Sequence, residues 1–313
     1  MKKVLFIVDP VSSLNVKKDS SIAMMRASAA LGFDVYTCEI SDLSVLSDGF
    51  VCALVKSMAV LSEGQNTWYQ ERSQLICRLT AFDVVLMRKD PPFDMRFVSA
   101  LWLLHRAVQQ GARVLNSPHA LLCQNEKLGI LEFPELISPT LVSACLDQVK
   151  QFHDQHKDII LKPLDGMGGT GVFRVRDDGM NLSACVETLT DSGLKPLMAQ
   201  RYIPAVVSGD RRVLVVHGQV IPFVLARMPQ KGETRANLAA GGTGVAQAIS
   251  DREREIAQTL APILLERGIA IAGLDVIGDY LTEINITSPT CLVEIKQQTG
   301  FDVAHQLMVH WSS

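Results

Sequence analysis

The chain has 313 residues, of which 48% are hydrophobic and 20% are charged, and its net charge is −3. This length predicts about two domains. The absence of a basic stripe argues against nucleic-acid binding, and no apolar run approaches the ~20 residues that cross a bilayer. The first apolar run stops at Asp9, which is too early for a secretion signal. The seven scattered cysteines form no CxxC pair, so we expect reduced thiols and a cytoplasmic location.

The N-terminal third alternates expected strands with expected helices. Asp19 or Ser20 can cap the first helix, and Gly32 and Gly111 can end the first and second helices. Strands are expected at 4–9, 33–40, 84–90 and 113–117, and helices at 21–31 and 95–110. This alternation predicts an open parallel α/β sheet in a first domain, residues 1–121.

Ligands of such sheets bind beyond the carboxyl ends of the strands. The polar segments 9–21 and 87–94 follow two of these ends and are therefore candidate binding segments. Segment 41–80 yields no functional prediction. We therefore expect a ligand at the edge of the first domain's sheet where these strands end.

The second half reads as pairs of strands joined by short turns. This pattern predicts antiparallel sheets of the α+β class, in a second domain at 122–200 and a third at 201–313. The expected hairpins pair 159–164 with 171–175, 212–216 with 220–227, and 271–278 with 280–285.

Residues 161–175 (LKPLDGMGGTGVFRV) place a glycine-rich turn between two expected strands. Gly166, Gly168 and Gly171 match a dinucleotide-binding pattern, but that motif needs a helix where VFRV predicts a strand. A glycine hairpin can instead place its backbone N–H groups over phosphates, and Lys162 could neutralise one of them. A flexible hairpin tip with a surface lysine is the alternative.

Two arginines are expected at one end of the hairpin that turns at His217 and Gly218. Arg212 begins one of its strands and Arg227 ends the other, so both guanidinium groups can meet an anion. A solvated sheet end is the alternative interpretation.

The glycine- and alanine-rich segment 228–244 follows. Segments of this length are often functional lids or disordered, and here Lys231 and Arg235 could reach an anion when the lid closes. We expect a lid that excludes water from a reactive intermediate, and a tolerated surface insertion is the alternative.

The last expected hairpin carries three oxygen-bearing side chains. Glu283 and Asn285 lie on one face of a strand, and a three-residue turn at 278–280 would place Asp275 opposite Glu283. A two-residue turn would move Asp275 to the other face. We prefer the first register, because it separates polar from apolar residues. Three oxygen ligands without His or Cys suit Mg²⁺ better than Zn²⁺, and a hydrogen-bonded core pair is the alternative.

Two histidines and one cysteine are also candidate functional residues, and a structural or solvated position explains each of them better. His153 and His156 lie on a polar segment without a visible third ligand, which favours a solvated helix face over a zinc site. Cys291 lies near the expected metal strand, and a structural thiol is its default interpretation.

Nearly the whole chain resembles the bacterial glutathione synthetases, a family of ATP-grasp ligases. The resemblance rests on the runs FIVDP, NVKKDSS, LMRKDPPFD, NEKL, DIILKPLDGMGG, GDRRVLVV, GETRANLAAGG, GLDVIGD and LTEINITSPTC. It implies an ATP-grasp fold preceded by an open parallel α/β domain, with ATP between the second and third domains. The implied reaction joins γ-glutamylcysteine and glycine through an acyl phosphate, at the cost of one ATP.

The resemblance also implies roles for individual residues. ATP would contact Lys127, Lys162, Gly166, Gly168, Gly169, Gln200, Tyr202, Ile203 and Asp210. Two Mg²⁺ ions, which Mn²⁺ can replace, would be held by Asp275, Glu283 and Asn285. Arg212 and Arg227 would be catalytic. The dipeptide would be bound by Asn15, Ser20, Arg88, Ser288 and Thr290. Arg201 stands where a smaller polar residue is expected.

A homotetramer or other homo-oligomer with small-molecule substrates is implied as well. One alternative is another ATP-grasp carboxylate–amine ligase, such as a D-alanine–D-alanine ligase. The runs MRKDPPFD and SPTC argue against this alternative. The other is a nucleotide-binding regulatory module without catalysis, against which Lys162, Arg212, Glu283 and Asn285 weigh.

Overall fold

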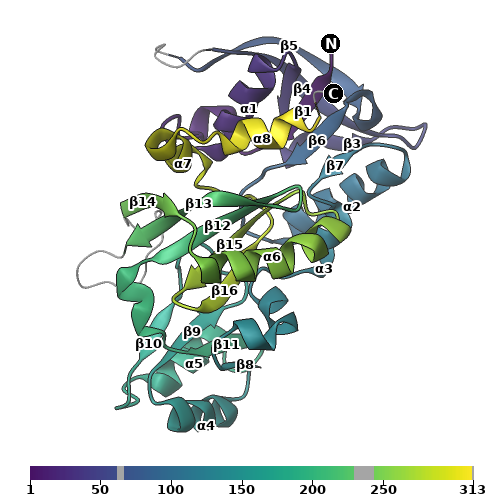
Figure 1. Ribbon diagram of the computed structural model, residues 1–313. Helices are drawn as coiled ribbons and strands as arrows, with labels where there is room; N and C mark the ends of the chain where they lie inside the picture. Colours follow the sequence, from purple (N-terminus) through teal and green to yellow (C-terminus); the bar gives the residue numbers. More distant parts are fainter. Residues whose placement is uncertain (62–66, 229–242, 312–313) are drawn as a thin grey trace.

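The computed structural model describes residues 1–61, 67–228 and 243–311. Three sheets follow one another along the molecule, each with helices packed on it (Figure 1). In these described residues, no helix combines the length and the apolar character that crossing a membrane requires. The expected lid falls largely on residues 229–242, so Lys231 and Arg235 lie outside the described part of the chain.

The N-terminal sheet has the order β3-β4-β2-β1-β6-β7, with β5 paired to β4. Its elements are β1 (Lys3–Ile7), α1 (Ser20–Ala30), β2 (Asp34–Cys38), β3 (Leu43–Val45), β4 (Val51–Val60), β5 (Tyr69–Arg78), β6 (Val84–Met87), α2 (Met95–Gln109), β7 (Val114–Leu115) and α3 (Pro118–Cys123). The four strands β2, β1, β6 and β7 are parallel, as predicted.

The remainder of this sheet is antiparallel, so the sheet is mixed, with the predicted parallel strands extended by an antiparallel arm. Segment 41–80, which carried no functional prediction, supplies β3, β4 and β5. A tightly connected hairpin can pair only antiparallel, and β5 is exposed along most of its length. This arm therefore extends the sheet away from the parallel strands.

Local capping explains where the first two helices begin. Asp19, and not Ser20, caps α1, because its carboxylate accepts hydrogen bonds from the amides of Ser21 and Ile22 at 2.7 and 3.1 Å. Asp94 caps α2 in the same way. Each capping carboxylate accepts amide hydrogens that the first helical turn leaves unpaired.

The middle sheet has the order β10-β9-β11-β8, and all of its pairings are antiparallel. Its elements are β8 (Thr140–Ser143), α4 (Leu146–His156), β9 (Ile159–Pro163), β10 (Phe173–Val175), α5 (Leu182–Thr190) and β11 (Leu197–Arg201). Buried aliphatic side chains of α4 and α5 pack against β9 and β11 to form a small core of their own.

The C-terminal sheet has the order β14-β13-β12-β15-β16 and is antiparallel throughout. The chain passes through β12 (Asp210–Val216), β13 (Gln219–Met228), β14 (Thr243–Ala248), α6 (Asp251–Glu266), β15 (Ile271–Ile277), β16 (Tyr280–Asn285), α7 (Leu292–Thr299) and α8 (Val303–Val309). Helices α7 and α8 return to the first domain and pack against α1 (Figure 1). The division of the chain at 121 and 200 stays a prediction.

All three predicted hairpins are present. Strand β9 pairs with β10, β12 with β13, and β15 with β16. The turn of the second lies at His217 and Gly218, whose φ angles of 47° and 74° are both in the left-handed region that two-residue hairpin turns require.

The register of the last hairpin places Asp275 opposite Glu283, as predicted. The turn, however, contains two residues and not three, because Ile277 pairs with Tyr280. A bulge at the level of Thr282 adds one residue to β16 and restores the predicted pairing. The bulge was not foreseen, since sequence alternation alone does not distinguish it from a longer turn.

Candidate active site

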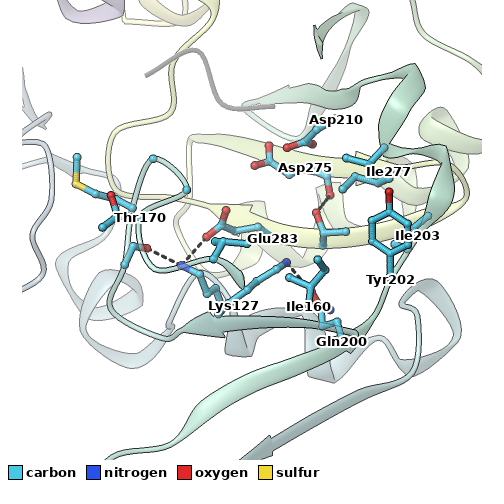
Figure 2. Close-up of a pocket in the computed structure, with 18 of the residues that line it drawn as sticks. Lys127, Ile160, Thr170, Gln200, Tyr202, Ile203, Asp210, Asp275, Ile277 and Glu283 are labelled. Carbon is cyan, nitrogen blue, oxygen red and sulfur yellow. Dashed lines mark hydrogen bonds and ion pairs between the residues drawn. The ribbon is translucent and has the colours of Figure 1, made fainter. Parts of the chain in front are cut away.

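A cavity of about 890 Å³ lies between the middle and C-terminal sheets (Figure 2). We call it the inner cavity. Its lining contains every residue predicted to contact ATP, namely Lys127, Lys162, Gly166, Gly168, Gly169, Gln200, Tyr202, Ile203 and Asp210. The structure thus brings together residues that lie up to 83 positions apart in the sequence, from 127 to 210.

The glycine-rich turn forms one side of the inner cavity. Gly168 and Gly169 have φ angles of 61° and 82°, which side chains other than glycine rarely adopt. At Gly166 a Cβ atom would lie 2.6 Å from Cγ of Pro163, so close packing excludes a side chain there. The loop joins two strands, which removes the dinucleotide-binding alternative.

Two lysines line the cavity, Lys127 buried and Lys162 partly buried. Lys162 Nζ donates a 2.6 Å hydrogen bond to Gln200 Oε1, and burial lowers the pKa of this lysine. Lys127 Nζ donates to the Gly166 carbonyl at 2.6 Å and pairs with Glu283 at 3.0 Å (Figure 2). These side chains are held in place before any anion binds.

One end of the inner cavity is mostly apolar. Ile160, Ile203 and Ile277 line it together with the ring of Tyr202 (Figure 2). Arg201, the residue that departs from the expected pattern, also lines the cavity and donates a 3.2 Å hydrogen bond to the Tyr280 hydroxyl. A flat apolar group would therefore fit between strands of two different sheets.

Tyr202 is itself held by an arginine. The guanidinium carbon of Arg174 lies 3.5 Å from the centroid of the Tyr202 ring. Asp158 fixes that guanidinium through two hydrogen bonds of 2.9 and 2.6 Å. Sequence reasoning missed Arg174, because the strand pattern does not reveal which side chain stacks on which ring.

The predicted arginine pair converges on Asp275. Arg212 Nε donates to Asp275 Oδ1 at 2.5 Å, and Arg227 Nη2 lies 2.8 Å from Asp275 Oδ2 and 2.6 Å from Asp210 Oδ2. Burial alone would raise the pKa of Asp275, but the two guanidinium groups hold it well below its ordinary value. Burial raises the pKa of Asp210 in spite of Arg227.

A second cavity, of about 1420 Å³, adjoins the inner cavity on the side of the N-terminal domain. This wide cavity shares Glu283 and the glycine turn with the inner cavity. Both arginines and Asn285 line it, and so do three of the predicted dipeptide ligands, Asn15, Ser288 and Thr290.

The two other predicted dipeptide ligands lie behind the wall of the wide cavity. Arg88 is buried, and its Nη2 donates to the Pro289 carbonyl at 2.9 Å. Ser20 is buried as well, and its hydroxyl accepts a long, 3.4 Å hydrogen bond from the amide of Leu292. Their position favours support of segment 288–292 over direct contact with a ligand.

The three predicted metal ligands are two carboxylates and a carboxamide, each of which can offer an oxygen atom to a metal. Glu283 is partly exposed between the two cavities, and the Asn285 carboxamide nitrogen donates to the Gly273 carbonyl at 3.0 Å. Among the described residues, Asp210 Oδ1 has no hydrogen-bond partner. This donor set fits a hard divalent cation.

The expectation of a solvated helix face is wrong for His153, whereas Cys291 is a buried thiol. His153 is buried, and its Nε2 lies 2.6 Å from the Arg176 carbonyl oxygen. The described residues contain no cluster of three or more His, Cys, Asp or Glu side chains arranged for a metal. Cys291 is buried at the start of α7 with a φ angle of 84°.

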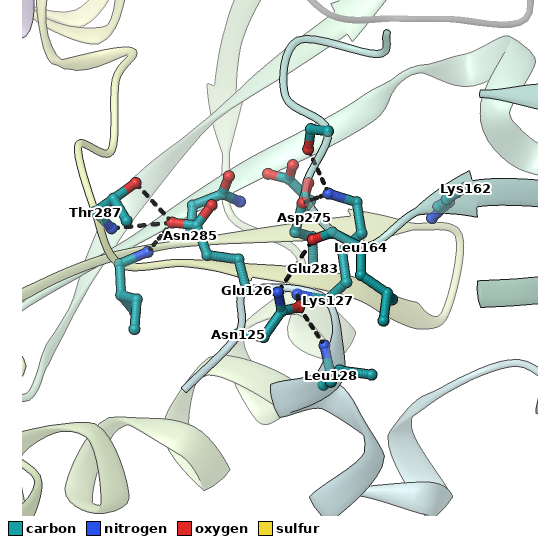
Figure 3. A network of polar contacts seen from close by, with 12 residues as sticks. Asn125, Glu126, Lys127, Leu128, Lys162, Leu164, Asp275, Glu283, Asn285 and Thr287 are labelled. Carbon is teal, nitrogen blue, oxygen red and sulfur yellow. Dashed lines mark hydrogen bonds and ion pairs between the residues drawn. The ribbon is translucent and has the colours of Figure 1, made fainter. Parts of the chain in front are cut away.

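A third cavity of about 630 Å³, the side cavity, was not foreseen. Its lining includes Glu126 and Thr287, which also line the wide cavity. Glu126 belongs to the run NEKL, so its sequence context could have drawn attention to it. Its contacts with Ile286 and Thr287, just after β16, however, appear only in the structure (Figure 3).

Two family models together match nearly the whole chain. Residues 2–121 match the prokaryotic glutathione synthetase N-terminal domain, and residues 126–300 match the prokaryotic glutathione synthetase ATP-grasp domain. A glutathione synthetase of Ralstonia nicotianae is 52% identical over 302 residues, which cover 96% of this chain and 93% of the relative. A glutathione synthetase of Vibrio parahaemolyticus is 47% identical over 308 residues, with coverages of 98% and 97%.

Solved structures of lower identity share the fold. The crystal structure of D-cycloserine synthetase DcsG superposes with a TM-score of 0.69 at 16% identity, and covers 99% of this chain and 98% of that one. The macrocyclase MdnC of Microcystis aeruginosa, bound with precursor peptide MdnA, gives 0.66 at 16% identity, with full coverage of both chains. At such identity these likenesses establish the fold alone.

Proposed function

The chain belongs to the prokaryotic glutathione synthetase family, and from this premise we propose that it joins γ-glutamylcysteine to glycine at the expense of ATP. The products are glutathione, ADP and phosphate. The observation that carries the proposal is the contact between the inner and wide cavities at Glu283 and the glycine turn. Two reactants can meet there, one from each side.

The inner cavity has the features that ATP requires. Its apolar end, with Tyr202 and Ile203, takes the flat adenine base. Lys127 and Lys162 lie toward the glycine turn, where the turn's backbone N–H groups and two positive charges can bind phosphate oxygens. The nucleotide would therefore lie with its γ-phosphate toward the wide cavity.

Asp275, Glu283 and Asn285 would hold the divalent metal, which we propose to be two Mg²⁺ ions that Mn²⁺ can replace. The all-oxygen donor set and the unpaired Asp210 Oδ1 support this proposal. Bound Mg²⁺ would neutralise phosphoryl charge. Arg212 and Arg227 already compensate the charge of Asp275 without a metal, so the carboxylate stays ionised, and a metal at Asp275 would share its oxygens with these guanidinium groups.

The wide cavity would hold the dipeptide with its cysteinyl carboxylate toward the γ-phosphate. That carboxylate attacks the phosphorus, and the bond to ADP breaks to leave an acyl phosphate. The glycine nitrogen then attacks the acyl carbon, the C–N bond forms and the C–O bond to phosphate breaks. Of the two protons that the ammonium loses, one leaves with the phosphate and one passes to solvent. Arg212 and Arg227 lie where negative charge develops in both steps.

One assay tests the function. Purified protein is incubated with ATP and Mg²⁺, and phosphate release is measured with γ-glutamylcysteine plus glycine, with D-alanine, and without a second substrate. We expect one phosphate per glutathione in the first reaction and little in the others. Phosphate release that depends on D-alanine, or ATP binding without turnover in any mixture, would contradict the proposal.

Arg174→Met tests the adenine end of the inner cavity. Loss of the stacked guanidinium should weaken ATP binding by ~2- to 30-fold, since a cation–π contact contributes ~0.5–2 kcal/mol and each ~1.4 kcal/mol is a factor of ten. Turnover at saturating ATP should not change, because Arg174 stacks on Tyr202 at the apolar end of the inner cavity. The measurement is KM for ATP, with the exposed Arg176→Met on the same stretch as control. Equal KM values in both variants would show that the Arg174–Tyr202 stack has no role in binding.

We further propose that the protein acts in the cytoplasm as a homotetramer or other homo-oligomer. The family resemblance supports the assembly, and the scattered unpaired cysteines support the compartment.

A further inference from the structure

Glu126 is a carboxylate without a cationic partner beside the reacting groups. Its Oε1 accepts hydrogen bonds from the Ile286 amide at 2.7 Å, and from the amide and the hydroxyl of Thr287, both at 2.9 Å. Figure 3 shows all three bonds reaching the same oxygen. Oε2 takes part in none of them.

The neighbouring carboxylates differ in this respect. Glu283 pairs with Lys127, and Asp275 pairs with two arginines. Within the described ranges of the chain, no lysine, arginine or histidine lies within 4.0 Å of the Glu126 carboxylate. Burial and the nearby charge of Glu283 raise the pKa of Glu126. A partly buried carboxylate of this kind gains most from a cation that binds beside it.

The side cavity gives such a cation a route. Pro91, Phe93, Leu122 and Leu164 line it, and these apolar residues would exclude water. It shares Lys127 with the inner cavity and Glu126 with the wide cavity. It also shares Gly166 and Met167 with both of them. The side cavity therefore opens where the acyl phosphate would form.

Three reactants meet in the proposed reaction, and two of them already have a cavity. With ATP in the inner cavity and the dipeptide in the wide cavity, the side cavity is left for the amino acid that accepts the acyl group. We propose that the acceptor glycine enters through the side cavity and that Glu126 Oε2 binds its ammonium group. This assignment rests on the proposed function.

Glu126→Gln separates the charge of Glu126 from its structural role. The glutamine oxygen can still accept the three hydrogen bonds that Oε1 accepts, so the segment after β16 should keep its place. We expect KM for glycine to rise ~10- to 100-fold, the loss typical of one hydrogen bond to a charged group. KM for ATP, KM for γ-glutamylcysteine and Tm should not change. Glu132→Gln, an exposed carboxylate paired with Arg267, is the matched control.

Hydroxylamine provides a second readout. It is mostly uncharged at neutral pH and captures acyl phosphates as hydroxamates, so it needs no ammonium partner. We expect Glu126→Gln to form the hydroxamate of γ-glutamylcysteine at the wild-type rate while its ligation of glycine falls. A wild-type protein that forms neither hydroxamate nor glutathione would overturn the proposed function, and this assignment with it.

Other outcomes would overturn the assignment of Glu126 to the glycine ammonium but leave the proposed function intact. A rise in KM for γ-glutamylcysteine would place the dipeptide's ammonium at Glu126, and a greater need for Mg²⁺ would make Glu126 a metal ligand. If the variant has a lower Tm, and if its rates of glycine ligation and of hydroxamate formation fall equally, the role of Glu126 is purely structural. If the variant does not fold, the assignment can be tested in the wild-type protein by measuring how glycine analogues inhibit glycine ligation. Glycinamide, which keeps the ammonium, should compete, whereas equal competition by glycolate would contradict the assignment.

Discussion

Arg212→Ala should lower kcat by ~10²- to 10³-fold, the usual loss when one donor that stabilises transition-state charge is removed. KM for ATP should change little, because Arg212 lines the wide cavity and not the inner cavity. The measurement is steady-state turnover with ATP varied at saturating γ-glutamylcysteine and glycine.

The neighbouring Arg211→Ala is the control for this substitution. Arg211 is partly exposed and pairs with Glu253 at 3.2 Å, so its loss should leave kcat unchanged. Thermal unfolding of the Arg212 variant must accompany the kinetics, because breaking a buried ion pair often costs ~3–5 kcal/mol. Arg227 still pairs with Asp275 in that variant, which favours retention of the fold. Wild-type turnover would show that Arg212 serves only as a structural partner of Asp275.

Glu283→Gln should reduce kcat by ~10²-fold or more and raise the Mg²⁺ concentration needed for half-maximal activity. A bound metal supplies several kcal/mol of charge stabilisation, and each ~1.4 kcal/mol corresponds to a factor of ten in rate. Glu283 lies on the shared wall of the inner and wide cavities, where that charge would develop in the proposed reaction. Titration of Mg²⁺ at fixed ATP measures both quantities.

The glutamine in this variant can still accept from Lys127, whose Nζ lies 3.0 Å from Glu283 Oε1. The change therefore removes a charge with little loss of packing. Asp279→Asn, at the exposed turn of the same hairpin, removes a charge away from the cavities and should behave as wild type. An unchanged Mg²⁺ requirement in the Glu283 variant would remove this residue from the metal site.

Much of the fold and of the site follows from local sequence. The strand and helix alternation predicted the parallel strands of the first sheet, and short turns predicted the three hairpins. The glycine turn was identified as a strand–loop–strand unit, since VFRV lacks a helical pattern. Polar and apolar alternation placed Asp275 opposite Glu283. These predictions succeed because side-chain periodicity and glycine conformations depend on neighbours in sequence.

Tertiary structure alone decided how these segments meet. The bulge at Thr282 and the antiparallel arm from segment 41–80 depend on pairing with distant strands. Two arginines converge on one carboxylate, and Glu126 lines the side cavity, only because residues distant in the sequence pack together. Local pattern shows which face of a strand is polar, whereas burial and charge pairing depend on what packs against that face. The sequence by itself therefore determined the elements and the candidate residues, and the packing of three sheets decided which of those residues share a cavity.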